Sequence, residues 1–532
     1  MRIYGERLSC RWYLFFCIVS VGCSSGASDT REELVVHVRE DGPENVEEII
    51  TSLTCTKNEL KIGINPSFRS RYLKADFFAF YDEDIDLEKM PYEIVTMPLI
   101  CNIISLIWIS GKTYSIDSMD ENLYHSLKTI KKIFQLSYPR TVWEGHLIPK
   151  KLVKFSKQCP VKKAFIEKHT SPLLTTLQQI IRATEKVFHL SDCESARYEK
   201  EGSKGSKVFL EQSSCPKRAL LFSGGLDSTS SLFFHNNEKL MLITAWGQYD
   251  NPLEKEHIWE KRKKKITQIA RLYGHTNAFL KSNYAEFFNW KLLDTISPDI
   301  DNWRICTVEG IGWAGLVAPI FFAKGYSELY IASSTSWYYP YIDCINPYVD
   351  HSVRFGNYRL LHDQFDYTRL DKAIFIATLC KEKGLKKPFI KVCQYTRKVD
   401  DINCCECRKC LTTILSLFVV DKEYHKYGFP VSLQAAVHRS MRLLKKGVTY
   451  ETVWNFMDIQ NTLKDVIDHF EPSVVETLRP FLNMNLAKRH ISDRRYIKKI
   501  DWRDFTKLVP TITIPFDLST KKLAINTLLP IE

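Results

Sequence analysis

Residues 221–229 read LFSGGLDST, an apolar run followed by two glycines, three hydroxyl residues and an aspartate. Glycine lets the backbone adopt positive φ and approach a ligand without a Cβ atom in the way. Successive N–H groups can then converge on one point, and the N-terminus of a following helix adds partial positive charge. The stretch therefore predicts a buried strand, a phosphate-binding loop and a helix opened by Asp227.

The spacing of this loop excludes two better-known phosphate-binding patterns. The Walker loop requires Gly-Lys-Ser/Thr after its first glycine, and this tripeptide does not follow Gly224 and Gly225. The dinucleotide fingerprint G-x-G-x-x-G is also absent from the stretch. The alternative is a tight strand-to-helix turn whose Asp and Ser side chains only cap the helix. A buried strand before the loop and the hydroxyls on both sides of it favour phosphate binding.

The sequence around the loop alternates between short apolar runs and longer helical patterns. The predicted strands are RALLF, KLMLITAW, NAFLKS and ELYIASS, and the predicted helices between them include 257–274 and 309–325, each ending in glycine. Such alternation predicts an α/β fold with a doubly wound parallel sheet. Ligands of these sheets bind beyond the carboxyl ends of the strands.

Sixteen cysteines are present, and most are scattered singly. The exception is CCECRKC at 404–410, preceded by KVCQYT around Cys393. Four thiolates make a closed tetrahedral zinc site, so we predict zinc ligands at Cys393, Cys404, Cys407 and Cys410. The alternatives are reduced thiols without metal, a redox pair or an iron–sulfur cluster.

SGGLDS resembles the SGGxDS signature of the PP-loop ATP pyrophosphatases, which cleave ATP to AMP and pyrophosphate while adenylating a substrate oxygen. The resemblance implies an adenine nucleotide alpha hydrolase-like fold, ATP as substrate and Mg²⁺ bridging the phosphate oxygens. It also implies catalytic roles for Asp227 and Ser228. The residues implied to bind the nucleotide here are Ser223, Gly224, Gly225, Leu226, Asp227 and Ser228.

The cysteines narrow the resemblance to the 7-cyano-7-deazaguanine synthase family. The spacing C-x10-C-x2-C-x2-C is similar to the zinc knuckle of that family, with Cys405 in place of a glycine. Gly247-Gln248 resembles its Y-G-Q segment and implies two more nucleotide-binding residues. Arg369 and Lys372 resemble part of its L-T-K-x-E segment and imply catalytic cations, although an R-x-x-K pair is also typical of a solvated helix face.

Other features depart from that family. Its P-x-R-N segment is not recognisable in NWRICTVEGIGWAG, and the match covers only about 215–420 of 532 residues. The resemblance therefore implies the ATP half-reaction, while the acceptor stays open. We expect an extended relative, of a kind also found in antiviral defence gene sets.

Four parts are predicted from the remaining patterns. Residues 1–150 mix strand-like and helical runs and are predicted to form an N-terminal α+β domain. Residues 151–214 are predicted to be a helical connector and polar linker, and 215–420 the ATP-binding domain with its zinc knuckle. Residues 421–532 are predicted to form a mainly helical C-terminal extension, and either extension is a candidate for binding a protein partner.

The net charge of +12 suits an anionic substrate and permits nucleic acid. An apolar run at 12–23 has the length of a signal-peptide core, but a buried strand is the preferred interpretation because the chemistry needs cytosolic ATP and reduced thiols. No other segment is expected to be long and apolar enough to span a membrane. We therefore predict a cytoplasmic location.

The predicted activity is ATP-dependent adenylation of a small carboxylate or amide, followed by attack of a nitrogen nucleophile. One alternative is a tRNA-modifying enzyme of the thiolation or lysidine type, which would use basic stretches such as 260–265 and 487–499. The other is a nucleotide-binding partner protein without turnover.

Overall fold

The computed structural model describes residues 46–155, 216–337, 344–393, 402–489 and 502–509. Parts of the predicted regions lie outside these residues, including the apolar run at 12–23 and residues 156–214 of the connector and linker.

A nine-stranded sheet runs through the molecule in the order β11-β12-β10-β7-β8-β9-β4-β3-β2. Its centre is five parallel strands, with β7 between β10 and β8. The prediction of an α/β fold with a parallel sheet is confirmed. The parallel strands are β7 (Arg218–Leu221), β8 (Met241–Trp246), β9 (Thr276–Ser282), β10 (Glu328–Ala332) and β12 (Tyr358–Asp363).

The N-terminal part of the chain continues this sheet. Strand β4 pairs antiparallel with β9, and β3 and β2 follow. Residues before and after the predicted boundary at 150 therefore share one sheet and one hydrophobic core. These strands are β2 (Ile50–Cys55), β3 (Glu59–Ile64) and β4 (Phe77–Tyr81). The opposite edge of the sheet is β11 (Arg354–Phe355). A second, three-stranded sheet consists of β1 (Glu47–Glu48), β5 (Thr113–Asp120) and β6 (His146–Val153).

Helix α2 (Tyr92–Ile109) contradicts the expectation about membrane spans. It has 18 residues and a mean hydropathy of 1.7, which is long and apolar enough to cross a membrane, but 89% of it is buried inside the protein. It packs on α9 (Ile311–Lys324), where a Cβ atom on Gly315 would lie 2.5 Å from the Cβ of Cys101. Within this fold α2 is a core helix.

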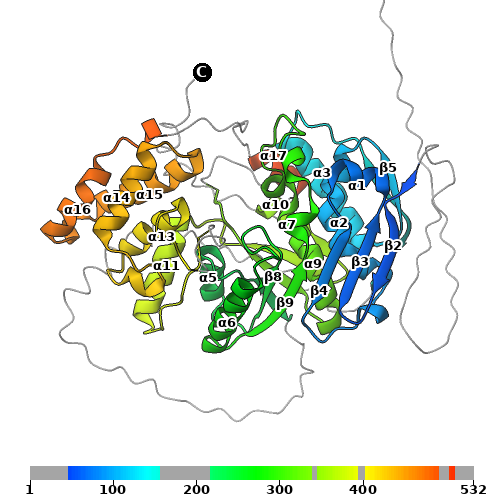
Figure 1. The fold of residues 1–532 in the computed structure, drawn as a ribbon, viewed down its shortest axis with the longest axis horizontal. Coiled ribbons are helices and arrows are strands. Elements are labelled where there is room, and N and C mark those ends of the chain that lie inside the picture. The colour runs from blue at the N-terminus through cyan, green and yellow to red at the C-terminus, as the bar shows by residue number, and fades with distance from the viewer. Residues whose placement is uncertain (1–45, 156–215, 338–343, 394–401, 490–501, 510–532) are drawn as a thin grey trace, which may run out of the picture.

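A second hydrophobic core lies on the other face of the sheet and extends into the C-terminal helices. Figure 1 shows those helices gathered at one end of the molecule and the N-terminal strands at the other. The helices of this core are α5 (Leu226–Phe234), α6 (Glu256–Leu272), α11 (Arg369–Glu382), α13 (Arg408–Phe418), α14 (Leu433–Lys445), α15 (Tyr450–Asp465) and α16 (Pro472–Leu482).

One long helix, α3, and several short elements complete the described chain. They are α1 (Pro66–Tyr72), α3 (Glu121–Ser137), α7 (Tyr284–Phe287), α8 (Trp290–Leu293), α10 (Pro347–Asp350), α17 (Trp502–Leu508), a π-helix η2 (Arg304–Val308), and 3-10 turns at Leu87–Lys89, Tyr424–Tyr427, Ile467–His469 and Ala487–Arg489.

Candidate functional site

The strand order reverses between β7 and β10. Successive strands run from β7 towards β9 on one side, whereas β10 and β12 lie on the other. Ligands of open parallel sheets bind in the crevice at such a reversal, beyond the carboxyl ends of the strands. A cavity of about 580 Å³ lies there and is lined by residues 221–223 and 225–228, the ends of β8 and β10, and α9 and α13. We call it the central cavity.

The loop after β7 has the shape that its glycines predict. Gly224 has a φ of +72°, a region that side chains other than glycine rarely adopt. The Ser223 hydroxyl accepts a hydrogen bond from the Gly225 N–H at 3.2 Å and lies 3.2 Å from the Ser228 hydroxyl. Leu226 is buried as the first residue of α5 and also lines the cavity.

Asp227 lies at the centre of a charged cluster on the cavity wall. Its Oδ2 accepts a hydrogen bond from Arg369 at 2.5 Å, and its Oδ1 lies 3.9 Å from the ammonium of Lys372. Burial raises the pKa of Asp227, but Arg369, Lys372 and Lys409 outweigh burial and lower it overall. Asp227 is therefore an anion that holds Arg369 at the cavity.

The two cations predicted from the R-x-x-K pair take different positions. Arg369 lines the central cavity, whereas Lys372 is not among the lining residues. Lys372 is fully buried and donates a hydrogen bond to the carbonyl of Ser333 at 2.5 Å. Burial lowers the pKa of Lys372 to about 8, and Asp227 opposes this shift. Lys372 thus contacts Asp227 without reaching the cavity.

Gly247 and Gln248 lie at the end of β8. Gly247 has a φ of +86°, and a Cβ atom on it would lie 1.7 Å from the carbonyl oxygen of Ser282. Gly247 therefore allows β8 and β9 to approach each other closely. Gln248 lines the cavity and accepts a hydrogen bond from the indole of Trp313 at 3.0 Å, while its buried Nε2 has no partner in the described part of the chain.

The sequence reasoning missed several charged residues of the cavity. Asp250 lies 3.2 Å from Arg262 of α6, and Arg408 lies 2.7 Å from Glu451 of α15. The last pair shows that the C-terminal extension contributes to the cavity wall. The missed lining residues with charge are Asp250, Arg262, Asp294, Arg304, Glu309, Lys391, Arg408, Lys409 and Glu451. For Arg408 and Lys409, the basic pair inside CCECRKC was an available signal.

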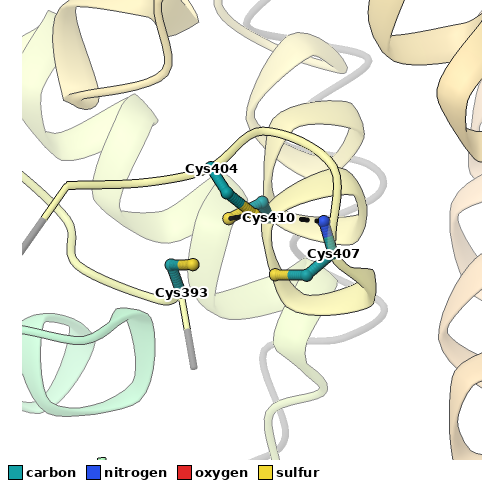
Figure 2. Close-up of side chains that lie close together, drawn as sticks. All are labelled: Cys393, Cys404, Cys407 and Cys410. Carbon is teal, nitrogen blue, oxygen red and sulfur yellow. Dashed lines mark hydrogen bonds between the residues drawn. The ribbon is translucent and has the colours of Figure 1, made fainter. Parts of the chain in front are cut away.

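The four predicted cysteine ligands come together beside the loop. Figure 2 shows Cys393 facing Cys404, Cys407 and Cys410 across a small space, with the last two at the start of α13. Their sulfur atoms all lie within 4.8 Å of one another, and those of Cys404 and Cys410 are 3.9 Å apart. Zinc–sulfur bonds of about 2.3 Å in a tetrahedron place sulfur atoms about 3.8 Å apart. The cluster could hold a metal ion such as zinc.

Cys405 does not belong to this cluster. Its φ of +55° places it in the left-handed region, and its thiol donates to the carbonyl of Asn403 at 3.6 Å. Burial and the neighbouring Cys404 raise the pKa of Cys405 to about 11. A glycine at this position would adopt the same backbone conformation without strain.

Asn403 joins the two described segments that carry the cluster cysteines, residues 390–393 and 402–410, which together we call the cysteine loop. Its Oδ1 accepts hydrogen bonds from the N–H groups of Val392 and Cys393 at 3.1 and 3.2 Å. Its Nδ2 donates to the carbonyls of Ile390 and Gly428 at 2.7 and 3.0 Å. The same segment contacts residues 222–228, the loop predicted to bind phosphate, which we call the phosphate loop: the Lys391 N–H donates to the Gly224 carbonyl at 2.7 Å.

The basic run at 260–265 is partly used inside the protein. Arg262 pairs with Asp250, Lys263 lies 2.5 Å from Asp82, and the ammonium of Lys265 lies 4.4 Å from the ring of Phe389. The run is thus not a uniform row of solvated cations.

No protein-family model matches the chain, and no match was found among curated proteins or among solved structures.

Proposed function

We propose that this protein is an ATP-using enzyme that forms AMP and pyrophosphate while adenylating a carboxylate or amide oxygen. The observation that carries the proposal is the position of SGGLDS: the loop borders a cavity of about 580 Å³ at the reversal of the strand order, with the anionic Asp227 bonded to Arg369. ATP would occupy this crevice, as nucleotides do in comparable sheets. The resemblance to the 7-cyano-7-deazaguanine synthase family supports the same chemistry.

The residues divide the work of binding between them. The N–H groups of the loop and the N-terminus of α5 would receive the phosphates, together with the hydroxyls of Ser223 and Ser228. Arg369 would balance their charge, with Asp227 fixing the direction of its guanidinium. Magnesium, when bound together with the nucleotide, would supply additional positive charge at the phosphates.

The reaction needs no nucleophilic side chain. An oxygen of the acceptor would attack the α-phosphorus, and the bond to the bridging oxygen would break, so that pyrophosphate leaves with the electron pair. A nitrogen nucleophile would then attack the adenylated carbon, and AMP would leave. Catalysis of such a step rests on positioning and on stabilisation of developing negative charge. A zinc ion at the four cysteines would act structurally.

Product analysis tests this proposal directly. The zinc-loaded protein is incubated with Mg²⁺, ATP labelled on the α-phosphate and a panel of small heterocyclic carboxylic acids, and the labelled products are separated. We expect AMP that depends on one acceptor and disappears in Asp227→Ala. Labelled ADP would contradict the proposal. AMP that requires tRNA would favour the tRNA-modifying alternative, and ATP binding without turnover would favour the non-catalytic one.

A further inference from the structure

The wall of the central cavity formed by the cysteine loop carries three cations. Lys391 lies two positions before Cys393, and Arg408 and Lys409 lie between Cys407 and Cys410. All three line the same cavity as Asp227, but from a different set of elements. Around this cavity, α11 packs against α13 and α15, and the phosphate loop contacts the cysteine loop through the hydrogen bond from Lys391 to Gly224.

Arg408 is held in place by the C-terminal extension. Its Nη1 donates to the carboxylate of Glu451 at 2.7 Å and to the hydroxyl of Thr452 at 3.4 Å. Burial raises the pKa of Glu451, but Arg408, Lys409 and Arg369 lower it overall, so that the carboxylate stays charged. Glu451 thereby acts as a positioning residue for Arg408.

Lys409 differs from its neighbours in having no partner. Among the described residues, no hydrogen bond or ion pair within 4 Å involves its ammonium, although this ammonium lowers the pKa of Asp227, Asp250 and Glu451. The side chain is half-buried, and these carboxylates act on its ammonium from beyond direct contact, so they compensate only part of the cost of its desolvation. The N-terminus of α13 adds further positive potential at the same place.

We propose that Arg408 and Lys409, assisted by Lys391, form a second anion subsite that binds the carboxylate of the acceptor. The inference rests on the proposed function for the identity of this anion. The proposed donors for the phosphates of ATP are the loop and Arg369, a different set of groups from these three cations. A carboxylate on Lys409 would lie in the same cavity as the nucleotide. The C-terminal extension then determines acceptor recognition, because it supplies Glu451.

Binding measurements on the zinc-loaded full-length protein test the subsite. Benzoate serves as a compact carboxylate probe, and α,β-methylene ATP with Mg²⁺ serves as the nucleotide; both dissociation constants are measured by titration calorimetry. We expect benzoate to bind in the presence of saturating nucleotide. Lys409→Gln should weaken benzoate about tenfold and change nucleotide affinity less than twofold. Glu451→Gln should weaken benzoate by a smaller factor, because it removes only the support of Arg408.

Two controls separate the subsite from a general charge effect. Lys264→Gln removes an exposed lysine from the same protein and should change neither constant. Lys409→Arg retains the charge and should retain benzoate affinity within about threefold. Zinc content and thermal unfolding of each variant show that the fold is kept.

The proposal is overturned if wild-type protein does not bind benzoate, or if Lys409→Gln weakens the nucleotide as strongly as Arg369→Gln does. The second result would assign Lys409 to the phosphates. Failure of the proposed function looks different: benzoate would still bind in a Lys409-dependent way, but no acceptor would yield AMP.

Discussion

The phosphate loop and the cysteine loop border the same cavity but are held by different means. The phosphate loop grows directly out of the sheet: the Phe222 N–H donates to the carbonyl of Ile243 at 2.8 Å, and Thr244 donates to the carbonyl of Phe222 at 2.6 Å. The cysteine loop has no strand of its own in the described chain, and its halves meet through Asn403 and four sulfur atoms. Backbone geometry stabilises the first loop, whereas side-chain ligands stabilise the second.

This difference predicts where each loop is vulnerable. A loop fixed by the sheet tolerates loss of a functional side chain and fails when its backbone is forced to move. A loop fixed by ligands fails when one ligand is removed. The hydrogen bond from the Lys391 N–H to the Gly224 carbonyl connects the two loops. A change that displaces the cysteine loop should therefore also weaken the proposed binding of the nucleotide.

Removal of one metal ligand should have the largest effect. Cys410→Ser replaces a fully buried thiol of the cluster, and zinc binding contributes about 10 kcal/mol or more in small zinc domains. We expect loss of about one zinc per chain, a lowered melting temperature and at least tenfold weaker binding of α,β-methylene ATP. Metal analysis, calorimetry and nucleotide titration measure these three quantities.

Cys405→Ser is the matched control for that experiment. Cys405 is buried in the same loop, but its sulfur does not belong to the cluster. The variant should keep its zinc and its nucleotide affinity. Equal zinc loss in the two variants would contradict the assignment of the ligands.

Substitution within the phosphate loop should affect chemistry more than folding. Asp227→Asn leaves the size of the side chain unchanged but removes the charge that holds Arg369. We expect AMP formation to fall about 10²- to 10³-fold, as on loss of other transition-state contacts. Zinc content should remain that of wild type. Full turnover in this variant would show that Asp227 does not serve the reaction.

A backbone change at the end of β8 should cost stability. In Gly247→Ala the new methyl group would meet the carbonyl of Ser282, in addition to the unfavourable positive φ. We expect a loss of about 2–4 kcal/mol in the free energy of unfolding. Gly274→Ala is the control, since Gly274 also has positive φ but has no atom within 4 Å of a new Cβ. It should cost only about 1 kcal/mol. Chemical denaturation compares the two, and equal losses would mean that the contact with Ser282 has no effect.

Much of the central sheet could be predicted from the sequence because its signals are local. Short apolar runs alternating with stretches of helical periodicity identified β7, β8, β9 and β10. Strand β12 was not predicted because it carries charged and polar residues. The pairing of β4 with β9 was not predicted because it joins segments about 200 positions apart in the chain. Long-range pairing of this kind leaves no local pattern. For the same reason, the sequence did not reveal that residues before and after position 150 share one hydrophobic core.

The candidate site shows the same limit. SGGLDS and the cysteine spacing indicated residues whose chemistry depends on near neighbours. Glu451 was missed because its partner Arg408 lies 43 positions earlier, and only packing of α15 against α13 brings them together. The resemblance implied that Lys372 is a catalytic cation, and neither it nor the R-x-x-K spacing revealed that this side chain is fully buried.

The smallest predicted effect tests the backbone of the cysteine loop. Cys405→Gly removes a side chain from a left-handed residue, whose φ of +55° costs about 1 kcal/mol for residues other than glycine. It also removes a buried thiol, which offsets part of that gain. We expect the free energy of unfolding to rise by no more than about 1 kcal/mol, with zinc content unchanged. Cys405→Ala keeps the strain and loses the thiol, so it should be less stable than Cys405→Gly. The reverse order would mean that packing of the side chain, rather than backbone conformation, determines which residue this loop accepts.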